Sequence, residues 1–212
     1  MLKYKHIIVE GNIGAGKTTL ATFLSESFGT SLLLEEFEEN DFLKEFYKNK
    51  DFILHAEVQF ILDRSKQLFL FHKDKHDLII SDYTPTKSLI FSKMNLDKAD
   101  YNLVEQLVFS LYKTLPQPDL MIYLNRPISK LKENILKRGR EYETGISYEY
   151  LQKVEDAYKD FLKQQQDYPV LMIDAEEIDL NNKEKLKQRF QEVLNTNFEN
   201  RVRKIELNLE QV

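Results

Sequence analysis

The chain of 212 residues contains no cysteine and no tryptophan, and it has no excess of basic residues. Without cysteine there is neither a disulfide framework nor a thiolate metal site. The net charge of −5 and the pI of about 5.5 argue against a protein that coats nucleic acid, since duplex binding needs a basic face that neutralises phosphates. The sequence therefore predicts no nucleic-acid partner.

Long apolar runs and metal-binding histidine clusters are also absent. No stretch approaches the roughly 18 apolar residues of a membrane-spanning helix, and no signal-peptide core precedes the first predicted strand. We therefore expect a cytoplasmic protein with no membrane partner. The histidines lack a ligand spacing with carboxylates, and the pair His72 and His76 is interpreted as a solvated polar end.

What the sequence does contain is an alternation of predicted strands and helices. Hydrophobic residues make up 42% of the chain, enough for one core, and we expect a single domain over residues 1–212. Short apolar runs predict strands at residues 6–10, 31–35, 77–81, 119–124 and 170–174. Helices are predicted at residues 17–27, 41–48, 53–72, within 86–114, and at 128–138, 147–166 and 183–195. This order predicts an α/β fold, a five-stranded parallel sheet with helices on both faces. The tail at residues 199–212 is either a frayed extension or a segment that contacts a partner.

A phosphate-binding loop follows the first predicted strand and opens the first predicted helix. Its pattern is Gly11-x-x-x-x-Gly16-Lys17-Thr18, in which glycines let backbone N–H groups close around a polyphosphate. Lys17 is expected to reach the outer phosphates, and the Thr18 hydroxyl is suited to bind Mg²⁺. The residues predicted to hold the phosphates are Gly11, Asn12, Gly14, Ala15, Gly16, Lys17, Thr18 and Thr19. The chain is therefore predicted to use a nucleotide.

A candidate general base lies at the end of the second predicted strand. The sequence has no Asp-x-x-Gly switch followed by Asn-Lys-x-Asp, which a GTPase would carry, so a small-molecule kinase is the better hypothesis. Glu35 and Glu36 end this strand, beside the phosphate loop in a doubly wound sheet. We choose Glu36 as the base that accepts the proton of a substrate hydroxyl. On residue types alone, the same segment is equally well an acidic loop before a helix.

Two arginines form a candidate clamp on the phosphates. Arg138 and Arg140 flank Gly139, and guanidinium groups neutralise and orient a transferring phosphoryl group. The alternative is an ordinary helix C-terminus, where basic residues and glycine are common. With the phosphate loop upstream, we interpret residues 137–146 as a lid.

Taken together, these segments resemble the deoxyribonucleoside kinase family over nearly the whole chain. The similar segments are residues 11–19, 35–47, 118–124, 138–151 and 168–174. The resemblance implies a P-loop kinase fold with an arginine lid, in a homodimer. It implies transfer of the γ-phosphate of ATP or another nucleoside triphosphate, with Mg²⁺, to the 5′-hydroxyl of a deoxynucleoside in nucleotide salvage.

The resemblance also implies roles for single residues. Glu36 matches the general base, and Arg138 with Arg140 matches the lid arginines. Tyr47 and Glu143 match the pair that holds the sugar 3′-hydroxyl. From residue type alone, Tyr47 would be interpreted as a core aromatic.

Base recognition is left open between two residues on the predicted helix 53–72. The family reads the base with a glutamine seven residues before an arginine, and counting back from Arg64 gives Glu57, with Gln59 two positions further along. An amide suits adenine, whereas a carboxylate accepts N–H groups, as on guanine. We favour a purine, deoxyadenosine, as substrate. The alternative for Arg64 is a solvated helix charge.

The sequence departs from the family after the third predicted strand. Asp82 keeps a carboxylate suited to Mg²⁺, but Tyr83 stands where the family has an arginine that contacts the transferring phosphate. Our hypothesis is that Lys87, one turn later, supplies that charge, as a point charge rather than a fork. Asn134 replaces an arginine that some members place over the donor base, which leaves ATP versus GTP open.

Two other functions are weighed against this one. A thymidylate-kinase-like nucleoside monophosphate kinase would share the phosphate loop and lid but needs more basic residues around positions 47–64. A non-catalytic nucleotide-binding regulator would be consistent with the change at Tyr83.

Overall fold

The computed structural model describes residues 2–36, 40–49, 51–73, 78–115 and 117–209. Within these ranges six parallel strands form one sheet in the order β2-β3-β1-β4-β5-β6. The strands are β1 (His6–Gly11), β2 (Ser31–Leu33), β3 (Ile79–Ser81), β4 (Leu120–Asn125), β5 (Val170–Asp174) and β6 (Val202–Ile205). The predicted parallel α/β fold is confirmed. His76, the strand start at Asp77, and the two ends of the predicted domain, Met1 and Val212, lie outside the described ranges.

The sheet has one strand more than the five predicted. β6 lies in the tail that sequence analysis left open, and it pairs with β5, with Val202 opposite Val170 and Ile205 opposite Ile173. Arg203 and Lys204 between them are exposed, so the strand is too short and too polar for an apolar run to reveal it. The tail therefore completes the sheet.

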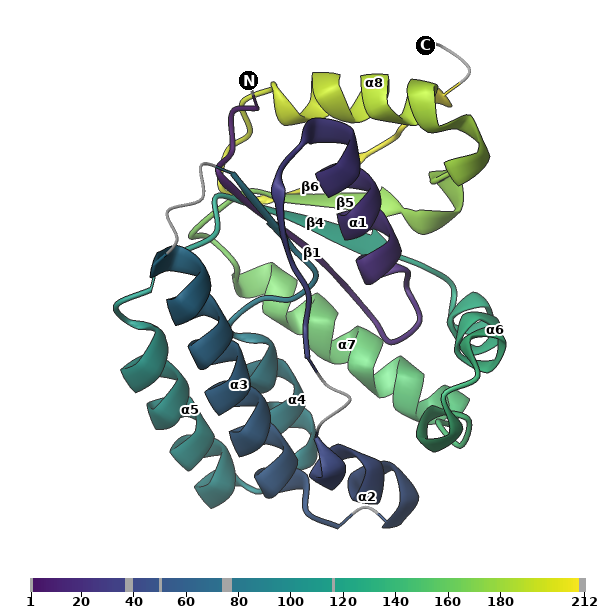
Figure 1. Ribbon diagram of the computed structural model, residues 1–212. Helices are drawn as coiled ribbons and strands as arrows, with labels where there is room; N and C mark the ends of the chain where they lie inside the picture. The colour runs from purple at the N-terminus through teal and green to yellow at the C-terminus, as the bar shows by residue number, and fades with distance from the viewer. Residues whose placement is uncertain (1, 37–39, 50, 74–77, 116, 210–212) are drawn as a thin grey trace.

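Helices cover both faces of the sheet (Figure 1). They are α1 (Lys17–Phe28), α2 (Asp41–Asn49), α3 (Ile53–Lys73), α4 (Lys87–Asn95), α5 (Lys98–Tyr112), α6 (Ile128–Arg138), α7 (Tyr148–Gln164) and α8 (Lys183–Leu194). The predicted helical region 86–114 is two helices, because the Asp97 side chain accepts the N–H groups of Ala99 and Asp100 and starts α5. Within the described ranges, no helix combines the length and apolarity needed to cross a bilayer.

Alternation along β1 explains how the layers pack. Ile7 and Val9 pack with α1, α6 and α8 in one core cluster, while Ile8 packs with α4 and α7 in another. Successive side chains of a strand point to opposite faces, so a continuous apolar run is what a strand covered on both sides requires. The carboxyl end of β1 is thereby held rigidly where the phosphate loop begins.

Candidate active site

The phosphate loop is held between β4 and α6, and this contact requires glycine at two positions. A Cβ at Gly11 would lie 2.8 Å from the Leu124 carbonyl oxygen, and one at Gly14 would lie 2.7 Å from the Leu131 carbonyl oxygen. Both residues also have positive φ, 153° and 81°. The Asn134 amide donates to the Gly14 carbonyl at 2.8 Å. Asn134 therefore holds the phosphate loop against α6.

Lys17 and Thr18 begin α1 and face the space that the loop surrounds. The Lys17 ammonium donates to the carbonyls of Gly11 at 2.9 Å and Asn12 at 3.0 Å. Burial, with the nearby charge of Lys87, lowers the pKa of Lys17 to about 8. The Thr18 hydroxyl donates to a carboxylate oxygen of Asp82 at 2.5 Å. The end of the phosphate loop therefore contacts the end of β3 through the Thr18 hydroxyl and the Asp82 carboxylate.

This pair of oxygens fits Mg²⁺. A protein site for Mg²⁺ needs one or two hard oxygen ligands, because the ion keeps waters and binds substrate phosphates. Thr18 and Asp82 supply such ligands beside the loop. Among the described residues there is no group of three or more His, Cys, Asp or Glu side chains that could hold a metal ion.

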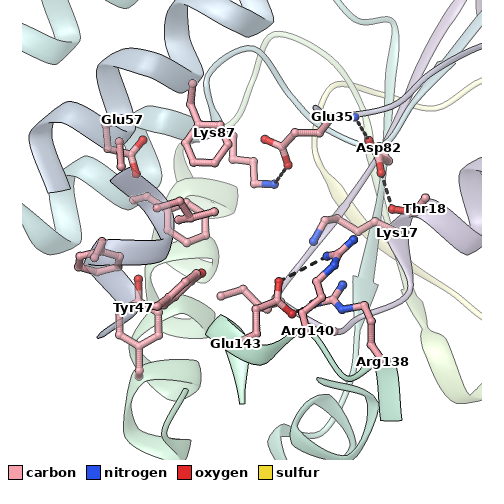
Figure 2. A pocket seen from close by; sticks show the side chains of 18 of the residues that line it. Lys17, Thr18, Glu35, Tyr47, Glu57, Asp82, Lys87, Arg138, Arg140 and Glu143 are labelled. Carbon is pink, nitrogen blue, oxygen red and sulfur yellow. Dashed lines mark hydrogen bonds and ion pairs between the residues drawn. The ribbon is translucent and has the colours of Figure 1, made fainter. Parts of the chain in front are cut away.

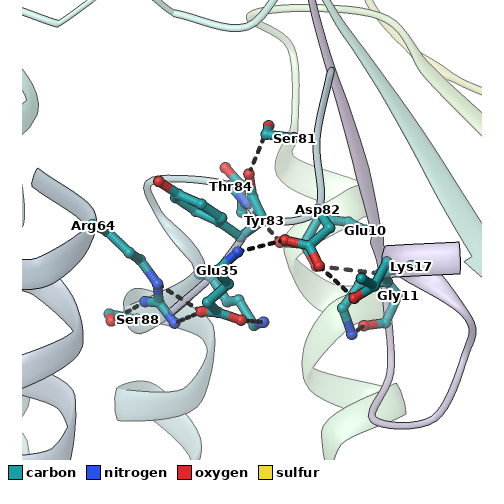
Figure 3. A network of polar contacts seen from close by, with 12 residues as sticks. Glu10, Gly11, Lys17, Glu35, Arg64, Ser81, Asp82, Tyr83, Thr84 and Ser88 are labelled. Carbon is teal, nitrogen blue, oxygen red and sulfur yellow. Dashed lines mark hydrogen bonds and ion pairs between the residues drawn. The ribbon is translucent and has the colours of Figure 1, made fainter. Parts of the chain in front are cut away.

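A buried carboxylate fixes the segment that carries Asp82 relative to the phosphate loop (Figure 3). Glu10 is fully buried and accepts the backbone N–H groups of Thr84 at 2.7 Å and Gly11 at 3.2 Å. It also accepts the Tyr158 hydroxyl of α7 at 2.8 Å. One side chain therefore joins β1, the loop after β3, and α7.

Glu35 is held by two cations (Figure 3). Arg64 on α3 donates from Nε at 2.8 Å and from a terminal nitrogen, and Lys87 on α4 donates at 2.6 Å. The Glu35 backbone N–H donates to Asp82 at 2.8 Å. Burial raises the pKa of Glu35, but the two cations outweigh burial and hold it at about 2. Glu35 is therefore a carboxylate at neutral pH.

The structure does not bring Glu36 to the site. Glu36 is exposed, whereas Glu35 lines the same cavity as Lys17 and the lid arginines. β2 ends at Leu33, and in the extended chain that follows, neighbouring side chains point in opposite directions. The Glu35 carboxylate turns inward, where Arg64 and Lys87 bind it. Two adjacent glutamates in the sequence carry no signal that distinguishes them.

The cavity, of about 360 Å³, lies between the phosphate loop, the lid and the helices α2, α3, α4 and α7 (Figure 2). Its polar lining residues are Lys17, Thr18, Thr19, Glu35, Tyr47, Glu57, Arg64, Asp82, Lys87, Asn95, Arg138, Arg140, Glu143 and Tyr150. Phe46, Phe60 and Phe91 add apolar walls. A site with apolar walls and a few convergent polar groups is typical of small-molecule binding.

The structure distinguishes the two candidates for base recognition. Glu57 lines the cavity, is 6% exposed, and has one carboxylate oxygen, Oε2, that is buried without a hydrogen-bond partner. Burial raises the pKa of Glu57 to about 7. Gln59 instead donates to Asp63 along the helix at 2.8 Å. Arg64 is 3% exposed, so it is not a solvated helix charge.

The Tyr83 side chain does not line the cavity. It is 1% exposed, packs in the cluster with Val104 and Val108, and its hydroxyl donates to Gln67 at 3.2 Å. Lys87 lines the cavity instead. The position of Lys87 is thus compatible with the hypothesis that it supplies the charge, and its role remains a prediction.

The lid places two arginines and a carboxylate on one turn. Arg138 ends α6, Gly139 follows with φ 73°, and Glu143 accepts hydrogen bonds from both Arg138 and Arg140. Across the cavity lies Tyr47 on α2 (Figure 2), whose pKa is raised by burial and by the charges of Tyr150 and Glu143. The structure therefore brings together the four residues that the resemblance assigned to the donor phosphates and the sugar.

Comparisons with known proteins agree with this geometry. A family model described as deoxynucleoside kinase matches residues 7–199. A deoxyguanosine kinase of Bacillus subtilis is 35% identical over 82% of this chain and 87% of its own length, and a deoxyadenosine kinase of Dictyostelium discoideum is 33% identical over 83% and 74%. The structure of deoxyadenosine kinase from M. mycoides with bound dATP is similar at a TM-score of 0.78, with 29% identity over 91% of this chain and 100% of that one. All three relatives carry the names of deoxynucleoside kinases.

Proposed function

This chain belongs to the deoxynucleoside kinase family of phosphotransferases, and we propose that it transfers the γ-phosphate of ATP to the 5′-hydroxyl of a purine deoxynucleoside. The observation that carries the proposal is one cavity lined by the phosphate-loop Lys17, the lid arginines and the buried carboxylate of Glu35. ATP bound to the phosphate loop and a deoxynucleoside bound beside Glu35 would meet inside this cavity. Glu35 takes the role that the sequence assigned to Glu36.

The cavity residues have separate roles in an in-line transfer of the phosphoryl group. The 5′-oxygen forms a bond to the γ-phosphorus as the bond to the β-phosphate oxygen breaks, and the hydroxyl proton passes to Glu35. Lys17, Arg138 and Arg140 neutralise the phosphate oxygens, and Lys87 adds a charge beside Glu35. Thr18 and Asp82 would hold Mg²⁺, which supplies charge neutralisation when bound.

Phosphoryl transfer from labelled ATP, with Mg²⁺, tests this function. The four deoxynucleosides and their monophosphates are assayed in parallel, with GTP as a second donor. Product from a nucleoside supports the proposal and ranks bases and donors. Product from monophosphates alone, or none despite ATP binding, would overturn it.

Glu57 supports a base preference that depends on pH. An ionised carboxylate accepts the two adjacent N–H groups of guanine, whereas a protonated one donates to N1 of adenine and accepts from its amino group. Because the pKa of Glu57 is about 7, both forms exist near neutrality. Burial and the charge of Glu35 raise the pKa of Glu57, whereas Arg64, Ser88 and Lys87 lower it. The sequence favoured deoxyadenosine; the carboxylate favours deoxyguanosine above pH 7.

We therefore expect the kcat/KM ratio of deoxyguanosine to deoxyadenosine to rise about a hundredfold between pH 6 and pH 8, because the ratio of ionised to protonated Glu57 changes tenfold for each pH unit. The sign follows from the raised pKa: the proton that adenine needs is present below about 7 and lost above it. Glu57→Gln should abolish this pH dependence and favour deoxyadenosine, while Gln59→Glu should leave the ratio within about twofold. A flat ratio in the unmodified protein would contradict the assignment.

We propose further that the protein is a homodimer that pairs through α3 and α5. These neighbouring helices expose Leu62, Phe69, Leu70, Leu103 and Phe109, with Phe69 64% and Phe109 60% exposed. Apolar side chains at this density on one face of a monomer usually mark an interface. A two-fold dimer would bury the same face of each copy.

The double variant Phe69→Glu, Phe109→Glu is expected to be a monomer of 25.2 kDa. Each subunit would bury two negative charges in the interface, where they would face the same charges on the other subunit. Light scattering after size exclusion gives the mass. Leu136→Glu, on α6 and 53% exposed, is the matched control and should remain a dimer. A monomeric mass for the unmodified protein would rule the interface out.

A further inference from the structure

Glu143 contacts both arginines of the lid with one carboxylate. Its Oε2 accepts a hydrogen bond from Arg138, and its Oε1 accepts one from Arg140 at 3.4 Å. Glu143 is 5% exposed, while the side chains of Arg138 and Arg140 are 36% and 26% exposed. The carboxylate is therefore the buried member of the group, and it sets where the two more accessible guanidiniums lie.

The segment that carries these residues is hydrogen-bonded to α6 and also has a hydrogen bond within it. Lys132 on α6 donates to the carbonyls of Thr144 at 2.8 Å and Ile146 at 2.5 Å, directly after Glu143. The Glu143 N–H donates to the Arg140 carbonyl at 3.0 Å. Glu143 and the two arginines therefore lie on one short segment that is hydrogen-bonded internally and to α6.

The other side of the same turn meets the acceptor half of the cavity. Tyr142 stacks on Tyr47 of α2, with ring centroids 6.3 Å apart and an interplanar angle of 18°, and Tyr150 meets Tyr47 edge-on at 6.4 Å. In Figure 2, Glu143 lies between Tyr47 and Arg140. A carboxylate offers about four lone-pair directions, so Glu143 can accept a sugar hydroxyl while it holds both arginines.

We propose that Glu143 is a positioning residue that couples the acceptor sugar to the donor phosphates, so that a 3′-hydroxyl on the acceptor strengthens the binding of ATP. The proposal rests on the proposed kinase function. A hydroxyl bound to Glu143 fixes the carboxylate, the carboxylate fixes Arg138 and Arg140, and the arginines then meet the phosphates with less ordering cost. By linkage, ATP strengthens the binding of the deoxynucleoside by the same factor.

The coupling is measured as an affinity ratio. The Kd of the β,γ-imido analogue of ATP, with Mg²⁺, is determined by calorimetry in saturating 2′-deoxyguanosine and in saturating 2′,3′-dideoxyguanosine. We expect the analogue to bind about tenfold more tightly beside the 3′-hydroxyl. Equal affinities in the unmodified protein would overturn the proposal.

Three variants assign the coupling to one side chain. Glu143→Gln should reduce the ratio to about one, because an amide cannot hold two guanidiniums. Glu141→Gln, an exposed residue of the same short helix, should keep the full ratio. Tyr47→Phe should weaken deoxynucleoside binding, yet keep the ratio once the acceptor saturates. A full ratio in Glu143→Gln would refute the role of this residue.

The same samples separate this inference from the function on which it rests. With ATP in place of the analogue, phosphoryl transfer to deoxyguanosine and deoxyadenosine is recorded. Transfer without coupling would overturn the role of Glu143 alone. Failure of all transfer would overturn the proposed function itself, whatever the affinity ratio.

Discussion

Glu35→Gln is expected to lower kcat about a thousandfold and to change the KM for ATP by less than about threefold. Glu35 is a carboxylate of the cavity close to the phosphate loop, since its own N–H donates to Asp82 and Asp82 accepts from Thr18. A glutamine has nearly the same shape but cannot accept the hydroxyl proton. The expected loss is therefore in turnover rather than in donor binding.

The size of this effect follows from the environment of Glu35. Despite its burial, Arg64 and Lys87 hold its pKa at about 2, so Glu35 is a weak base. In a loose phosphoryl-transfer transition state, the hydroxyl proton leaves late, when the oxygen is already acidic. A weak base that also orients the hydroxyl is sufficient, and general-base catalysis of this kind contributes about 10²–10⁴-fold.

Glu36→Gln is the matched control, because the two residues are neighbours in the sequence. Glu36 is exposed, and we expect its variant to keep kcat within about twofold, as for other surface substitutions. Thermal melting of both variants is recorded, since glutamine at position 35 leaves Arg64 and Lys87 without their partner. A large loss of kcat in Glu36→Gln, with normal turnover in Glu35→Gln, would show that Glu36 and not Glu35 is the general base.

Lys87→Ala is expected to lower kcat by about 10²–10³-fold and to change the KM for the deoxynucleoside by less than about threefold. The Lys87 ammonium is 2.6 Å from Glu35, and its side chain is 10% exposed. Tyr83, at the position of the family arginine, is turned into the core. Lys87 is therefore the cation that α4 contributes to the cavity where the phosphoryl group would cross to the acceptor.

Two further variants test whether the charge or its geometry matters. Lys87→Arg keeps the charge but presents a planar fork, and we expect it to recover part of the lost turnover. Lys93→Ala removes an exposed lysine from the same helix and should behave as the unmodified protein. Normal turnover of Lys87→Ala, with the protein folded, would show that no cation is needed there.

The phosphate loop, the parallel α/β order and the lid could be predicted from the sequence because each depends on residues close together in the chain. The loop needs glycines at fixed spacing between a strand and a helix. Strands covered on both faces need continuous apolar runs, such as Ile7-Ile8-Val9 in β1. Helix α6 ends at Arg138, as predicted, because Gly139 adopts the left-handed conformation directly after it.

Only the tertiary structure decided which of two similar residues faces the cavity. Glu35 and Glu36 are chemically identical, but the Glu35 carboxylate binds Arg64 and Lys87, 29 and 52 positions away in the sequence. Glu57, the residue that the family spacing gives, faces the cavity, while Gln59, which residue type left open, donates to Asp63 on its own helix. The pairing of β6 with β5 depends likewise on a distant strand. Local sequence fixes conformation through nearby atoms, whereas the direction of a side chain at the site depends on partners that only folding brings within reach.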